Sequence, residues 1–176
     1  ADPRLTGRGV CIGFVDSGFY PHPDLMRPER RIAAYVDVTR DLPVAAEFFA
    51  AQVFGWHGTM ASCCAAGNGY LSGGRYRGLA SASDVVLIKA GADRGRILGK
   101  NVANGIRLPL RHPELGIRVL NISLGVDRDD PDYDDVEAAV AHLAPAPAST
   151  PAPSENVCRS ESTKLVAPRC TGKGVR

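Results

Sequence analysis

Short apolar runs alternate along the chain with stretches whose apolar residues follow helical spacing. Apolar runs typical of buried strands occupy residues 8–15, 31–38, 84–90 and 117–125. Helical patterns occupy residues 57–69, 95–112 and 132–144, and residues 44–54 fit either a helical turn or a loop. This alternation predicts an α/β fold of three αβα layers, with a mostly parallel, doubly wound sheet covered by helices on both faces.

The pattern ends abruptly near residue 144. Residues 145–176 contain four closely spaced prolines and show neither strand nor helix periodicity, which is typical of a linker or a disordered tail. We therefore predict two segments, a folded part at 1–144 and a Pro-rich or aberrant tail at 145–176. A doubly wound domain normally continues with another strand at this point, so we expect a sheet that is incomplete at its C-terminal side and a fragment of marginal stability.

Composition excludes several classes of protein. Hydrophobic residues make up 44% of the chain, charged residues 23%, and the net charge is +2, all ordinary for a globular protein. No run of basic residues interleaved with aromatic ones occurs, and no apolar run reaches the roughly 20 residues of a membrane-spanning helix, so we expect neither nucleic acid nor membrane as a partner. The N-terminus lacks the pattern of a signal peptide, and the localisation stays undetermined.

The five cysteines are an odd number and do not have the spacing of a zinc site. Cys63 and Cys64 lie next to each other in the small-residue stretch at 57–66. We interpret them as small buried hydrophobes.

Asp16 and His57 are the candidate catalytic residues. Asp16 follows the first apolar run and His57 opens the first helical stretch. Alone, each would fit a turn or a helix cap equally well. Together with a serine hydroxyl they would form an Asp-His-Ser triad, in which the imidazole takes the hydroxyl proton and the carboxylate fixes the imidazole tautomer.

Four segments carry a common pattern: "GVCIGFVDSGFYPHPDL" at 9–25, "WHGTMASCCAAG" at 56–67, "GLASASDVVLIKA" at 78–90 and "VLNISLG" at 119–125. In this order they together resemble the subtilisin-like serine proteases. The resemblance implies that Asp16 is the catalytic acid and that His57 is the general base, with Gly58 and Thr59 holding the helix entry that presents the imidazole. It also implies that an extended polypeptide substrate pairs with Ser123, Leu124 and Gly125. It implies no required cofactor. Structural calcium is possible, but the acidic residues at 127–135 lack EF-hand spacing, and a solvated loop is the preferred interpretation.

The family's two remaining motifs, with the oxyanion asparagine and the nucleophilic serine, have no counterpart in this sequence. Asn68 lies in an Ala-Gly-Asn segment, but that segment stops the His57 helix. Ser62 lies one turn along the same helix, inside the histidine motif. The hypothesis is therefore a serine endopeptidase chain with acid and base but no nucleophile, inactive alone. The alternative is a non-catalytic peptide-binding fragment or pseudo-protease; a nucleotide-binding domain is disfavoured because no GxGxxG follows the first strand.

Overall fold

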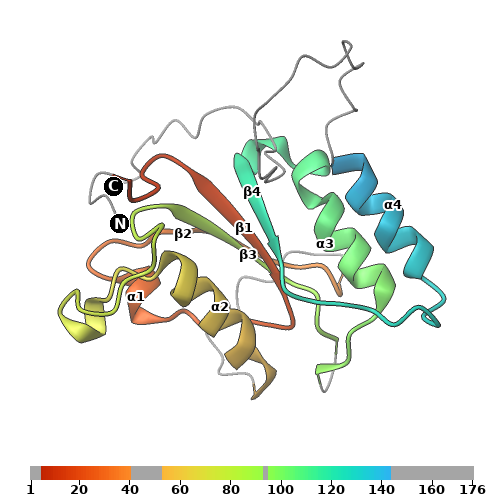
Figure 1. Cartoon of the computed structure of the whole chain (residues 1–176), viewed down its shortest axis with the longest axis horizontal. Coiled ribbons are helices and arrows are strands. Elements are labelled where there is room, and N and C mark those ends of the chain that lie inside the picture. Colours follow the sequence, from red (N-terminus) through yellow and green to blue (C-terminus); the bar gives the residue numbers. More distant parts are fainter. Residues whose placement is uncertain (1–4, 41–52, 93–94, 144–176) are drawn as a thin grey trace, which may run out of the picture.

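Four parallel strands form the sheet of the computed structural model, which describes residues 5–40, 53–92 and 95–143. The strands are β1 (Cys11–Asp16), β2 (Ile32–Asp37), β3 (Asp84–Lys89) and β4 (Ile117–Ile122), in the order β2-β3-β1-β4 (Figure 1). β1 and β3 lie in the middle, and their side chains are almost all buried because helices cover both faces. The predicted parallel α/β sheet is confirmed.

Helices cover the two faces of the sheet and complete the three layers (Figure 1). The short α1 (Pro23–Met26) and α2 (Trp56–Ala66) pack on one face, and α3 (Gly99–Arg111) packs on the other, with α4 (Tyr133–Leu143) alongside α3. Because successive side chains of a strand point to opposite faces, Ile12 and Phe14 of β1 enter the core beneath α2, whereas Cys11 and Val15 enter the core beneath α3. Three short 3-10 turns occupy Val53–Gly55, Tyr70–Ser72 and Pro113–Leu115.

The observed strands are shorter than the apolar runs, for local reasons. β1 begins at Cys11 rather than at residue 8, because Gly7 and Gly9 both have positive φ and the Val10 N–H closes a turn onto the Gly7 carbonyl. β4 ends at Ile122 rather than at residue 125, because β1 has ended at Asp16 and only the Ser123 N–H still reaches it, at the Val15 carbonyl. The helices begin and end within a few residues of the predicted patterns, and Gly67 ends α2.

β4 is the outermost described strand on its side of the sheet. Val119 and Ile122 are exposed on it, although both are apolar. An exposed apolar edge strand favours association with another chain, which agrees with the expected incomplete sheet. The predicted marginal stability stays a prediction.

The interpretation of the cysteines as buried hydrophobes is wrong for Cys64. Cys63 is half-buried, Cys64 is exposed, and only Cys11 of the described cysteines is buried. The reason is helical spacing: residues 58, 62 and 66 of α2 face the core, and position 64 points to the opposite side. Cys158 and Cys170, like the whole of 144–176 and residues 44–52, lie outside the described residues. No helix of the described ranges combines the length and apolarity needed to cross a bilayer.

Candidate active site

Asp16 is the last residue of β1 and is buried, with 1% of its side-chain surface exposed. It lies on the α2 side of the sheet because it alternates in step with Ile12 and Phe14. The Ser17 backbone N–H donates to Asp16 Oδ1 at 2.7 Å, and the Ser17 hydroxyl donates to the same oxygen at 3.1 Å. These bonds satisfy a buried carboxylate and hold it in one orientation.

His57 is the second residue of α2, and its Nδ1 lies 3.0 Å from both carboxylate oxygens of Asp16. Since a carboxylate can only accept, the proton of this bond belongs to Nδ1, and Nε2 is left as the acceptor of a neutral ring. The His57 side chain is 39% exposed, and its ring meets the Trp56 ring edge-on at 5.5 Å between centroids. The imidazole is therefore tied to the carboxylate on one side and open on the other.

Gly58 allows α2 to come this close to the end of β1. A Cβ at this position would lie 2.3 Å from the Gly18 carbonyl oxygen and 2.8 Å from the Asp16 Cβ. Thr59 fixes the same turn, since its Oγ1 donates to the Gly55 carbonyl at 2.6 Å and accepts from the Tyr20 N–H at 2.8 Å. The helix start is thus attached to the segment that follows Asp16, as expected of Gly58 and Thr59.

A row of charges crosses the C-terminal edge of the sheet at the level of Asp16. Lys89 of β3 is in register with Asp16 on one side and with Asp37 of β2 on the other. Its Nζ bonds to Asp37 Oδ2 at 2.8 Å, and Thr39 donates twice to Asp37 Oδ1. Burial alone would raise the pKa of Asp37, but the bonds from Lys89 and Thr39 outweigh it and lower that pKa. Asp37 therefore holds a buried ammonium next to the candidate acid.

A hollow of about 320 Å³ lies in front of His57 and contains the predicted substrate-binding segment. Ser17, Trp56 and His57 line one part of it, and Ser123, Leu124 and Gly125 line another. Gly125 is exposed, and no backbone hydrogen bond joins Leu124 or Gly125 to another residue in the described ranges. Four of the five predicted site residues thus line one hollow, and Asp16 lies buried behind His57; Leu124 and Gly125 offer backbone groups to a ligand.

Neither serine of this hollow bonds to the His57 ring. The single proton of the Ser17 hydroxyl has two acceptors within reach, Asp16 Oδ1 at 3.1 Å and the Phe54 carbonyl at 3.0 Å, and the Ser123 hydroxyl accepts from Asn121 Nδ2 at 2.7 Å. Ser62 is buried, with its hydroxyl donating to the Thr59 carbonyl. In the part of the chain that the structure describes, no serine hydroxyl bonds to His57.

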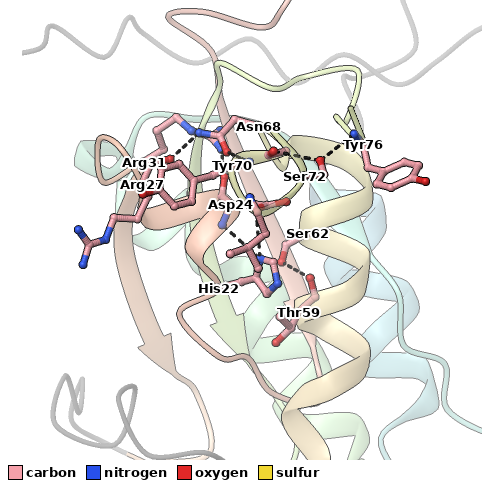
Figure 2. A network of polar contacts seen from close by, with 12 residues as sticks. His22, Asp24, Arg27, Arg31, Thr59, Ser62, Asn68, Tyr70, Ser72 and Tyr76 are labelled. Atoms are coloured by element: carbon pink, nitrogen blue, oxygen red, sulfur yellow. Dashed lines mark hydrogen bonds and ion pairs between the residues drawn. The ribbon is translucent and has the colours of Figure 1, made fainter. Parts of the chain in front are cut away.

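Asn68 has a structural role rather than a place in the hollow. Its Nδ2 donates to the Arg27 carbonyl at 2.6 Å, and its Oδ1 accepts from the Tyr70 N–H at 3.0 Å. Figure 2 shows it in a network with Asp24 and Arg31 at the end of α2 remote from His57. Asn68 therefore joins the segment after α2 to the segment after α1, and the helix stop is Gly67, whose N–H donates to the Cys63 carbonyl. Among the described residues, no three His, Cys, Asp or Glu side chains are grouped to hold a metal ion.

Comparison with known proteins agrees with these motifs and this fold. Residues 7–154 match the model of the subtilase family, the peptidase S8 group. The chain belongs to the subtilase family. It is 30% identical over 127 residues to the serine protease AprX of Bacillus subtilis strain 168, which covers 70% of this chain and 27% of AprX.

Two solved structures share the fold. The CspB protease of Clostridium perfringens superposes with a TM-score of 0.61 at 18% identity, over 78% of this chain and 35% of that one. A mutant of the protease domain of PatA superposes with a TM-score of 0.56 at 23% identity, over 80% of this chain and 48% of that one. At such identities the likeness concerns the fold alone. The chain spans less than half the length of each of these relatives.

Sequence reasoning missed Ser17 and the Asp37–Lys89 pair as surroundings of the candidate acid. Ser17 stands in the motif that identified Asp16, but the motif does not say which oxygen its hydroxyl meets. Asp37 and Lys89 each end an apolar run that predicts a strand, and this common position at the strand ends was the available signal.

Proposed function

We propose that this chain supplies the acid, the base and the substrate-pairing strand of a serine endopeptidase site. The observation that carries the proposal is the bond of His57 Nδ1 to the buried Asp16 carboxylate, next to the open backbone of Leu124 and Gly125. Membership of the subtilase family supports the same chemistry.

In this role Asp16 keeps the proton of His57 on Nδ1, so that Nε2 can accept a proton from a serine hydroxyl. As that proton leaves, the serine oxygen bonds to the carbonyl carbon of the substrate peptide and the carbonyl π electrons move to its oxygen. The resulting imidazolium is stabilised by Asp16 and gives its proton to the leaving amine as the C–N bond breaks. Water then hydrolyses the acyl-serine by the same transfers in reverse roles.

The nucleophile is the part that this chain does not supply. No serine of the sequence has the Gly-Thr before it and Met-Ala after it that the family's motif requires, and neither Ser17 nor Ser123 bonds to His57 among the described residues. Loss of a triad serine lowers the rate by several orders of magnitude. We therefore propose that the 176-residue chain has no peptidase activity alone.

Peptide binding without catalysis is a second candidate function. It is favoured by the absence of a bond from either serine of the hollow to His57 among the described residues, combined with the open backbone at Leu124 and Gly125. An extended peptide can add to such a segment through main-chain hydrogen bonds, and this requires no nucleophile.

A serine-directed fluorophosphonate probe separates the two candidates. We expect no labelling of the chain alone, and labelling of the serine in an added polypeptide that carries a subtilase Gly-Thr-Ser-Met-Ala segment and its helix. The matched variant His57→Ala should abolish that labelling. Stoichiometric labelling of a serine of this chain would refute the missing nucleophile, and labelling that persists with His57→Ala would refute the role of His57. Peptide binding without labelling in the complemented mixture would favour the non-catalytic function.

A further inference from the structure

A second hollow, of about 380 Å³, adjoins the candidate active site on the outer face of α2. Its walls include Tyr20 and His22 from the segment after β1, and Trp56, Met60 and Cys63 from α2. The three α2 residues follow at steps of four and three, so they form one stripe along the helix, apart from the core stripe of residues 58, 62 and 66. Figure 2 shows His22 next to Thr59 on this side of α2. We call it the α2 hollow.

The α2 hollow exposes large apolar side chains where a helix normally presents polar ones. Trp56 is 64% exposed and Met60 is 49% exposed, and Tyr20 is also exposed. Exposed apolar surface that gathers around a hollow, rather than being scattered singly, is typical of a binding site.

Three polar groups of the α2 hollow are engaged or neutral, namely Thr59 Oγ1, His22 Nδ1 and the Cys63 thiol. Thr59 Oγ1 donates to Gly55 and accepts from Tyr20, and His22 Nδ1 accepts from the Asp24 N–H. Burial, together with the nearby Asp24 and Cys64, raises the pKa of the Cys63 thiol to about 12, so this thiol is neutral at physiological pH. With these groups engaged and with large apolar side chains exposed on its walls, the hollow suits an apolar group.

Trp56 joins the α2 hollow to the candidate active site. Its side chain lines both hollows, and its ring contacts the His57 ring. A polypeptide lying in front of His57 thus passes the indole that forms the wall of the α2 hollow.

We propose that the α2 hollow is a specificity subsite that takes one large apolar side chain, aromatic or long aliphatic, of the polypeptide bound at the candidate active site. This rests on the proposed function, because it assumes that a polypeptide occupies the hollow in front of His57. Trp56 and Met60 are the residues that determine this specificity.

Trp56 is the sole tryptophan of the chain, so its fluorescence reports on the α2 hollow directly. The test titrates the 176-residue chain with capped Gly/Ala/Ser peptides in which a single Phe is moved along the sequence, and with the same peptides carrying Gly or Asp at that position. With Phe at one position we expect binding at least about tenfold tighter than with Gly, and a blue shift of the Trp56 emission, because burying a phenyl ring contributes more than a tenfold change requires. Asp at that position should bind no better than Gly.

Matched variants show whether the gain comes from the α2 hollow. Met60→Lys places a charge in the hollow and should remove the Phe gain, whereas Met60→Leu should keep it. Val140→Lys is the control. Val140 lies on α4, on the other side of the sheet, and its exposed fraction of 47% is similar to the 49% of Met60. Circular dichroism of each variant verifies that it is folded.

Equal binding of the Phe and Gly peptides, or a Phe gain that survives Met60→Lys, would overturn the subsite. Binding of the Gly peptides in that case would still support a peptide groove in front of His57. Absence of binding by every peptide would also overturn the subsite. Fluorophosphonate labelling with the His57→Ala control would then decide on the proposed function, because that experiment does not depend on the α2 hollow.

Discussion

Gly58→Ala tests whether the approach of α2 to β1 creates the bond between Asp16 and His57. On intrinsic preference alone the substitution stabilises a helix, since alanine is favoured over glycine by about 1 kcal/mol. The structure predicts the opposite sign. The new Cβ would lie 2.3 Å from the Gly18 carbonyl oxygen, and contacts below 3.0 Å essentially never occur, so the helix or the Gly18 turn has to move.

The magnitude follows from that displacement. The contact has to lengthen from 2.3 Å to at least 3.0 Å, and two further contacts at 2.8 Å, to Asp16 Cβ and Phe19 Cε1, oppose an alternative shift. Overpacking of this kind costs about 1–3 kcal/mol, which exceeds the gain in helix preference. A movement of this size also draws His57 Nδ1 away from the carboxylate oxygens, which now lie 3.0 Å from it. We expect lower stability and a weaker bond between Asp16 and His57.

Urea unfolding and the NMR signal of the His57 Nδ1 proton measure the two effects. The control pair is Cys64→Ala and Cys64→Gly, since Cys64 is exposed on the same helix and reports helix preference alone. There alanine should be more stable than glycine by about 1 kcal/mol, whereas at position 58 the order should reverse. If Gly58→Ala is as stable as the parent and its Nδ1 proton signal is unchanged, the close approach does not position His57.

Further predictions concern the Asp37–Lys89 pair, Asn68 and the two cysteines of α2. Asp37→Asn leaves the Lys89 ammonium, which is 11% exposed, without its carboxylate partner. This variant should lower the free energy of unfolding by about 3–5 kcal/mol. The double variant Asp37→Asn with Lys89→Met should regain most of the lost stability. Folding lowers the pKa of Asp37, so the contribution of its carboxylate to stability is complete above the unfolded pKa near 3.8 and is lost as pH falls through the folded pKa. The free energies of unfolding of the parent and of Asp37→Asn, measured by urea titration, should therefore converge in acid. Asn68→Ala removes two bonds to backbone groups and should cost about 1–2 kcal/mol. Asn68→Asp should not recover this loss, because it sets a carboxylate oxygen against the Arg27 carbonyl where the amide now donates; a stability equal to that of the parent would contradict this. A thiol reagent at mildly alkaline pH should modify Cys64 before Cys63, as peptide mapping would show, because the Cys63 pKa is raised to about 12.

The order of the elements and the two candidate catalytic residues could be predicted from the sequence because each rests on a local pattern. The apolar run that ends at Asp16 and the small-residue stretch that begins at His57 each determine their own element. Family motifs then indicated that the two residues meet, although 41 positions separate them. Their bond in the structure agrees with that expectation.

The surroundings of the site could not be predicted, because they depend on register between strands distant in the sequence. Lys89 lies between Asp16 and Asp37 only because β3 is inserted between β1 and β2. The exposure of Cys64 likewise depends on which stripe of α2 faces the sheet, and a stretch of uniformly small residues carries little amphipathic pattern from which to infer it.

The acid–base pair is positioned by packing that does not involve a nucleophile. Strand alternation places Asp16 on the α2 side along with the buried Ile12 and Phe14, and a shift of one residue would turn the carboxylate toward α3. Gly58 lets the helix approach, and its contacts are to Gly18, Asp16 and Phe19, all within the segment that ends β1. Since these constraints lie inside the described core, the bond between Asp16 and His57 should form in the chain alone. Its NMR signal is therefore a test of the pair that remains valid whatever supplies the serine.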